Sequence, residues 1–283
     1  MRYIKEMIWQ KIADSRLLTF AVFAMIITNI YNTPLKIFAK EMNYPSSIYT
    51  LPFLLAEHTY LILIIFGVIY SNADIPFMQS HHVYSMIRIG RQRWAFGQAV
   101  SIVVRSFIEV VILWICSVIT LLPNIEIGLE WGKLITTAGY GENAGIYGLY
   151  YRFYEETFIE FTPLQMMLLI VVIGTLVFSF LGLLMFLISL FTNRMCAVAA
   201  SLGISFLMFW VLNAHPMIRY RIARYVPTVW MEAAKIYTPD LGYYWIPSIT
   251  YMIGILIALL VIFIGFISIK AKNVEFDWKN EDL

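Results

Sequence analysis

Six long runs of apolar residues, separated by shorter polar stretches, dominate the chain. A helix that crosses the hydrocarbon core of a bilayer needs about 20 mostly apolar residues. The sequence therefore predicts six membrane-spanning helices, at residues 17–31, 50–71, 96–122, 164–191, 196–212 and 246–269. We expect an all-α, polytopic protein of the cell (plasma or inner) membrane, with residues 1–283 forming a single transmembrane domain.

A helical pattern also precedes the first span. Ile4, Met7, Ile8 and Ile12 recur at the spacing of one helix face, and polar residues lie between them. This pattern predicts a helix over residues 1–15 that lies in the membrane interface and contacts membrane lipid. The alternative is an N-terminal extension of the first span.

Composition agrees with a membrane protein and excludes two other classes. Of 283 residues, 60% are hydrophobic and 13% are charged, against about 25% charged in soluble domains. An ordinary soluble protein is therefore excluded. The formal net charge is only +2, and the basic residues are dispersed between the apolar runs. We therefore expect no nucleic-acid partner.

The positions of Lys and Arg predict the orientation of the chain. Basic residues cluster at positions 2–16 and 88–93 and recur at Lys270 and Lys272, and such residues are enriched in cytoplasmic segments. We expect both termini inside, with a cytoplasmic loop at 72–95 and a cytoplasmic tail at 270–283. An outer loop at 123–163 and an outer amphipathic segment at 213–245 follow, although arginines at 219–224 weaken the bias.

The sequence lacks the common motifs of nucleotide, metal and hydrolase sites. A phosphate-binding G-x-x-x-x-G-K-[ST] loop is absent, as are the H-E-x-x-H zinc pattern and the G-x-S-x-G nucleophile motif. We therefore expect no catalytic residue, no cofactor and no metal ligand in this chain.

A few polar residues fall within the apolar runs, where charge is costly and often functional. Glu57 and His58 lie near the outer end of the second span, and Arg105 and Glu109 lie in the third. The i, i+4 spacing of the last two predicts an ion pair on one helix, which we favour over a role in transport. Other candidates for a pathway or for helix–helix hydrogen bonds share an uncharged side chain: Asn29, Asn32 and Ser205.

The loop at 72–95 carries the most informative pattern. It opens with an acidic residue and Pro76, continues with apolar Phe77, Val83 and Tyr84, and ends with a glycine between arginines. This pattern predicts a short helix whose apolar side docks onto a partner. The alternative is a solvated loop whose arginines only follow the charge bias.

These features together resemble the permease subunit of a type-2 ABC exporter. The resemblance rests on the interfacial helix, six spans, the helix-bearing loop after the second span and the amphipathic segment before the sixth. Two short strings, Asp74-Ile75-Pro76-Phe77 and Arg88-Ile89-Gly90-Arg91-Gln92-Arg93-Trp94, are similar to the coupling region of such permeases. The outer loop at 123–163 is larger than in the minimal fold.

The resemblance implies a division of labour between subunits. A separate ABC ATPase subunit would bind and hydrolyse ATP, and a second permease chain, identical or different, would face the first, second and fifth spans. The residues implied in coupling to the ATPase are Asp74, Phe77, His81, Tyr84 and Arg88. Two alternatives remain: an ATP-independent transporter or channel, for which we expect broken helices or more intramembrane charge, and a membrane assembly or scaffold protein.

Overall fold

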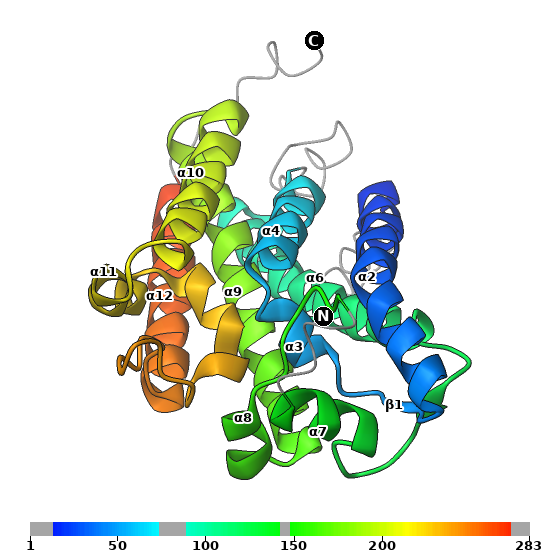
Figure 1. Ribbon diagram of the computed structural model, residues 1–283. Coiled ribbons are helices and arrows are strands. Elements are labelled where there is room, and N and C mark those ends of the chain that lie inside the picture. The colour runs from blue at the N-terminus through cyan, green and yellow to red at the C-terminus, as the bar shows by residue number, and fades with distance from the viewer. Residues whose placement is uncertain (1–13, 74–88, 142–147, 273–283) are drawn as a thin grey trace.

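The computed structural model describes residues 14–73, 89–141 and 148–272. This part of the chain is mostly helical, with one short pair of strands (Figure 1). Its elements are α2 (Ser15–Met42), β1 (Ser46–Ser47), α3 (Leu51–Leu55), α4 (His58–Asn72), α6 (Arg91–Ile119), β2 (Ile125–Glu126), α7 (Lys133–Tyr140), α8 (Glu155–Glu160), α9 (Pro163–Phe191), α10 (Arg194–Leu212), α11 (Pro216–Ile222), η2 (Ala223–Tyr225), η3 (Pro227–Lys235) and α12 (Ile249–Lys270).

Five of these helices are long and apolar enough to cross a membrane: α2, α6, α9, α10 and α12. Their starts follow local signals in the sequence. Thr162 and Gln165 form a capping box before α9, with Pro163 in its first turn. The Asn193 side chain accepts a hydrogen bond from the Cys196 amide at the start of α10.

The predicted second span differs from the structure because it consists of two helices. α3 ends at Leu55, and α4 begins at His58. Between them Glu57 has extended backbone angles, with φ −87° and ψ 120°, so the helix is broken there. α4 alone has 15 residues, which gives a length of about 22 Å, less than the hydrocarbon core.

The helix of the first predicted span is longer than the sequence indicated. α2 continues to Met42 rather than ending near Tyr31, and Pro34 lies inside it. Asn32, which we expected near the end of the span, is buried and hydrogen-bonded within the bundle. The helix ends at Asn43, which adopts the left-handed conformation with φ 56°.

The helices form two packed rows. α2, α4 and α10 lie side by side in the front of Figure 1, and α6, α9 and α12 lie behind them. α9 packs against α6, α12, α10 and α4, so it lies at the centre of the bundle. The row of α2, α4 and α10 therefore has one face on the core and one face turned outward.

One end of the bundle carries the ends of six of the described helices: α2, α4, α6, α9, α10 and α12. Arg16 at the start of α2 donates to the Tyr70 carbonyl oxygen near the end of α4, at 3.5 Å. Arg91 at the start of α6 donates to the carbonyl oxygen of Lys272, just after α12, at 3.3 Å. The Lys270 ammonium lies 4.7 Å from the centre of the Phe191 ring at the end of α9. We call this the basic end.

The opposite end is built from the connecting segments. β1 and β2 pair in parallel, with Ser46 opposite Ile125, and this is a departure from the purely helical fold that we expected. The predicted outer loop contains α7 and α8, and the predicted amphipathic segment contains α11, η2 and η3. η3 is buried from Pro227 to Ala234, so it is part of the core.

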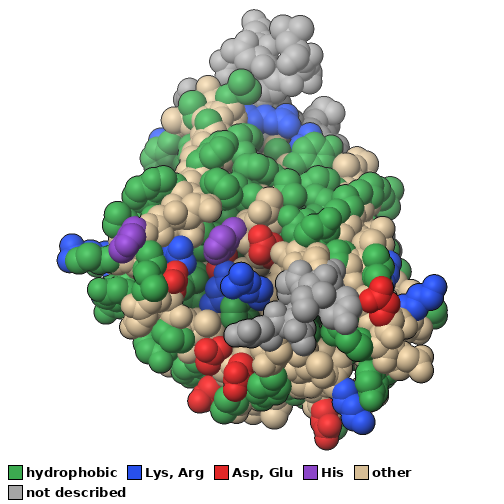
Figure 2. Space-filling model, in the orientation of Figure 1, with side chains coloured by type: hydrophobic (Ala, Val, Ile, Leu, Met, Phe, Trp, Pro, Cys, Tyr) green, Lys and Arg blue, Asp and Glu red, His purple; other side chains and the backbone are tan. Residues whose placement is uncertain are grey.

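The surface of the front row is mostly hydrophobic near the basic end. Figure 2 shows acidic and histidine side chains in the middle and lower parts of this face, with Lys and Arg side chains there and also near the top, above the hydrophobic surface. The exposed apolar side chains of the row include Val22, Ile26 and Ile30 of α2 and Phe206 and Trp210 of α10. A large uncovered apolar surface of this kind is compatible with a multi-pass membrane protein.

The close packing of α6 against α9 gives a first testable prediction. A methyl group added at Gly182 would lie 2.6 Å from Ile102 Cγ2 and 3.3 Å from Asn72 Oδ1. Gly182→Ala is therefore expected to lower the free energy of unfolding by about 1–3 kcal/mol, because overpacking forces neighbours apart. Thermal unfolding in detergent measures the effect, and Gly265→Ala on α12, with no atom within 4 Å of its added methyl group, is the control. Equal melting temperatures for both variants would contradict the prediction.

Candidate functional site

Among the residues that the structure describes, two clusters of charged side chains lie within the bundle, and the first is near the basic end. We define the inner polar cluster as Asp14, Ser71, Arg105 and Glu109. The Arg105 side chain is 1% exposed, and its Nη1 donates to Asp14 Oδ2 at 3.1 Å. Its Nε lies 3.6 Å from Glu109 Oε1 and 3.1 Å from Ser71 Oγ. Ser71 in turn donates to Glu109 at 2.7 Å.

The inner polar cluster joins three helices through one guanidinium. Asp14 caps α2, Ser71 belongs to the last turn of α4, and Arg105 and Glu109 lie one turn apart on α6. Arginine suits this position because its several N–H groups bind different acceptors at once. The cluster therefore fixes the relative positions of these helices near the basic end.

The second cluster lies at the break between α3 and α4. We define the outer polar cluster as His58, Tyr154, Glu232 and Lys235. The Glu232 side chain is fully buried and pairs with His58 Nδ1 through one oxygen. Its other oxygen accepts from Lys235 Nζ at 2.7 Å. The Lys235 ammonium also lies 5.8 Å from the centre of the Tyr154 ring.

The electrostatics of the outer polar cluster keep Lys235 charged. Burial alone would lower the pKa of Lys235, but the neighbouring Glu232 carboxylate and Tyr154 outweigh it, so the pKa of Lys235 is raised above its usual value. Burial raises the pKa of Tyr154, and the nearby Lys235 opposes this only in part. Near neutral pH the cluster therefore holds a lysine cation beside a neutral phenol.

The structure brings some of the predicted residues together. Arg105 and Glu109 lie on one helix face, as their spacing indicated, but their partners Asp14 and Ser71 were not predicted. His58 pairs with Glu232, which also binds Lys235, and sequence reasoning missed both of these residues. The available signal was Glu232 itself, a single acidic residue in the apolar segment Thr228-Val229-Trp230-Met231-Glu232-Ala233-Ala234. Such a residue, when buried, needs a basic partner.

The other polar candidates do not form one continuous path. Asn32 Nδ2 donates to Thr120 Oγ1 at 2.8 Å, and its Oδ1 accepts from the Tyr151 hydroxyl at 2.8 Å. Asn29 is exposed and accepts from Lys36 at 2.8 Å. Ser205 is buried and donates to the Ser201 carbonyl oxygen on its own helix at 2.9 Å.

Glu57 is the remaining candidate, and it is half-buried at the break beside His58. Its carboxylate accepts a long hydrogen bond from Thr59, at 3.4 Å. In the residues that the structure describes, Glu57 takes part in neither charged cluster.

The five residues implied in coupling to an ATPase lie outside the described residues, as does most of the predicted loop at 72–95. They are Asp74, Phe77, His81, Tyr84 and Arg88. The same holds for residues 1–13 of the predicted interfacial helix and for most of the predicted tail at 270–283. These expectations stay predictions.

The described parts of the chain contain no group of three or more His, Cys, Asp or Glu side chains placed to hold a metal ion. Comparison with known proteins does not indicate a function: no family model, no curated protein and no solved structure matches the chain. Its function must therefore be argued from its own residues.

Proposed function

We propose that the chain is the membrane permease subunit of an ATP-driven ABC exporter, working with a second permease chain and a separate ATPase subunit. One observation carries the proposal. The helices formed by the first, second and fifth apolar runs, which the resemblance places against the partner permease, lie together in the front row as α2, α4 and α10. Sequence order alone does not bring these three runs together.

The apolar outward face of the front row is suited to face the same surface of a second permease chain. Its outward side chains near the basic end are apolar, and they include half-exposed Leu63 and Phe66 of α4. Phe66 and Phe206 of α10 are 6.1 Å apart between ring centres, so they form one aromatic surface. Two such faces opposite each other would enclose an apolar pathway, which suits a hydrophobic or amphipathic cargo such as a lipid or a peptide.

Under this proposal the outer polar cluster closes one end of the pathway. It lies at the end of α4 away from Asn72, where η3 packs against α3 and α10. Under this proposal ATP-driven closure of the ATPase subunits favours one arrangement of the two permeases over the other. The chain itself binds cargo and partners, and it carries out no covalent chemistry.

The helix break favours one alternative function. Broken helices with charged groups at the break are typical of ion-coupled secondary transporters, and the sequence alone did not indicate such a break. The α3–α4 break with His58 and Glu232 therefore supports an ATP-independent transporter as the second candidate. The two candidates differ in one requirement, the ATPase partner.

The test is purification of the full chain, with an affinity tag, from cells that produce it naturally. We expect an ABC ATPase subunit to co-purify and to hydrolyse ATP.

Phe77→Ala combined with Tyr84→Ala is expected to weaken this association or to uncouple hydrolysis from transport, because aromatic side chains dominate many docking contacts. Ile127→Ala, an exposed residue in the outer loop, is the control.

Two outcomes would contradict the proposal. The first is a pure chain that transports without any ATPase, which would favour the second candidate. The second is an ATPase complex whose subunit ratio and hydrolysis are unchanged by the double substitution, which would remove the coupling role of the loop.

A further inference from the structure

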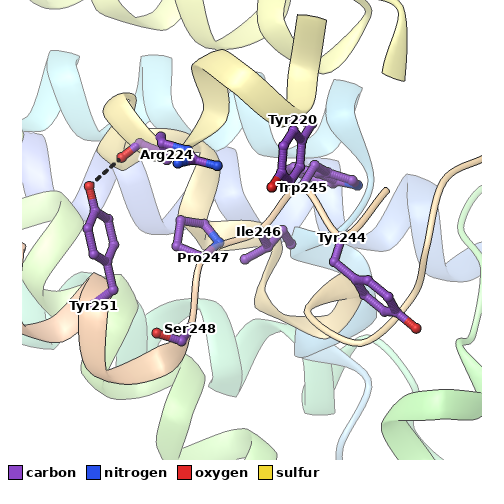
Figure 3. A pocket seen from close by; sticks show the side chains of 8 residues that line it. All are labelled: Tyr220, Arg224, Tyr244, Trp245, Ile246, Pro247, Ser248 and Tyr251. Atoms are coloured by element: carbon purple, nitrogen blue, oxygen red, sulfur yellow. Dashed lines mark hydrogen bonds between the residues drawn. The ribbon is translucent and has the colours of Figure 1, made fainter. Parts of the chain in front are cut away.

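A cavity of about 180 Å³ lies between the end of α11, η2 and the start of α12 (Figure 3). Its walls are mainly aromatic and apolar, with Tyr220, Trp245 and Tyr251 among them. Arg224 is the charged residue of its lining, and no Asp or Glu lines it among the described residues. The cavity therefore has a positive charge in apolar surroundings.

Arg224 differs from its neighbour Arg219 in having no acidic partner in the described part of the chain. Arg219 Nη1 lies 2.7 Å from Asp240 Oδ2, and its Nη2 donates to the Ala214 carbonyl oxygen at 3.1 Å. The Arg224 guanidinium instead lies 5.2 Å from the centre of the Tyr220 ring. That contact orients the guanidinium and leaves its charge unneutralised.

The wall that carries Arg224 is held in place by the core. The Tyr251 hydroxyl donates to the Arg224 carbonyl oxygen at 3.3 Å, as the dashed line in Figure 3 shows. Trp230, which is fully buried, donates from Nε1 to the carbonyl oxygen of Ala223 at 2.9 Å. A ligand in the cavity would therefore meet a wall that is already formed.

The length of α12 gives the depth of the cavity in a bilayer. α12 has 22 residues from Ile249 to Lys270, which corresponds to about 33 Å, close to one hydrocarbon thickness. Its exposed side chains include Ile257, Val261 and Phe266. If Lys270 lies at one membrane surface, the cavity at the other end of α12 lies at the opposite headgroup layer.

We propose that this cavity binds the headgroup of an anionic phospholipid. Arg224 would pair with the phosphodiester, because guanidinium and phosphate form charge-assisted hydrogen bonds. Ser248 is the N-cap residue of α12, but its side chain makes no capping hydrogen bond, so its hydroxyl is a second donor in the lining. The aromatic walls suit the glycerol and the first acyl carbons, and one cation matches one monoanionic headgroup. The inference rests only on the membrane-spanning part of the proposed function.

A free phosphate ion has the same oxygen chemistry but suits the cavity less well. It is more highly charged and fully hydrated, and it gains nothing from aromatic walls. The experiment must therefore separate the lipid from the free anion.

The test is native mass spectrometry of the full chain in detergent, titrated with phosphatidylglycerol or phosphatidylcholine. We expect one phosphatidylglycerol to stay bound, with about tenfold weaker retention in Arg224→Gln. Arg221→Gln removes the same charge from an exposed position on α11 outside the cavity, and it is expected to retain the lipid. Melting temperatures without lipid check that both variants fold alike.

Three results would overturn the inference. One is equal retention of phosphatidylglycerol by both variants, one is equal loss from both, and one is displacement of the lipid by millimolar inorganic phosphate. Carbonate extraction of membranes tests the underlying membrane assignment separately. If no ATPase subunit co-purifies but phosphatidylglycerol is retained, the proposed export function is contradicted and the proposed lipid site is still supported.

Discussion

Arg105→Met is expected to lower the free energy of unfolding by about 3–5 kcal/mol, the largest effect among our predictions. The reason is that Arg105 is the cation between two carboxylates in the inner polar cluster, and Glu109 is fully buried. Removal of one partner from a buried ion pair leaves the other charge without compensation. The methionine keeps much of the side-chain volume, so the decrease in the free energy of unfolding results mainly from removal of the charge.

Thermal unfolding and the yield of monodisperse protein in detergent measure this effect. Arg152→Met, at an exposed position of the predicted outer loop, is the matched control and is expected to change stability by less than about 0.5 kcal/mol. Arg105→Met combined with Glu109→Leu is expected to recover part of the loss, because the unpaired carboxylate is then gone. A single variant as stable as the control would show that the ion pair does not hold the helices together.

Glu232→Ala is expected to lower the free energy of unfolding by about 2–3 kcal/mol. The substitution removes the partner of both Lys235 and His58, and it leaves a small cavity in η3. The expected loss is smaller than for Arg105, because the Lys235 and His58 side chains keep 13% and 26% exposure and so can be partly hydrated. We also expect the α3–α4 break to loosen, since His58 then has no acidic anchor.

Labelling of an introduced cysteine measures this loosening. Thr59→Cys, in a chain without Cys116 and Cys196, is expected to react with a membrane-impermeant maleimide from outside, and faster when Glu232→Ala is present. Glu155→Ala, an exposed acidic residue on α8, is the control and is expected to leave both stability and labelling rate unchanged. Labelling only from the cytoplasmic side would contradict the predicted orientation of the chain.

The helices that the sequence predicted best are those with uninterrupted apolar runs. The predicted spans at 164–191 and 196–212 correspond to α9 and α10 within two residues at each end, because Thr162 and Asn193 provide local start signals. A run of about 20 apolar residues has few alternatives to a helix in hydrocarbon. The length and composition of these two runs are therefore sufficient to predict their helices.

The features that the sequence did not predict share a different cause, which is contact with residues far along the chain. The first span was predicted to end at residue 31, but Thr120 and Tyr151 satisfy the amide of the next residue, Asn32, and the helix continues. The break at Glu57 is associated with Glu232, 174 residues beyond His58. Similarly, the Arg105–Glu109 pair was predictable because it is local, whereas Asp14 and Ser71 come from other helices.

The hydrogen bonds of Asn32 have a consequence for biosynthesis. Asn32 belongs to α2, yet its partner Thr120 is synthesised 88 residues later and Tyr151 a further 31 residues on. During that interval the amide lies in an apolar helix without its native partners, and an unsatisfied polar group in hydrocarbon is unfavourable. We therefore expect α2 to reach its final depth and rotation only after Tyr151 has been translated.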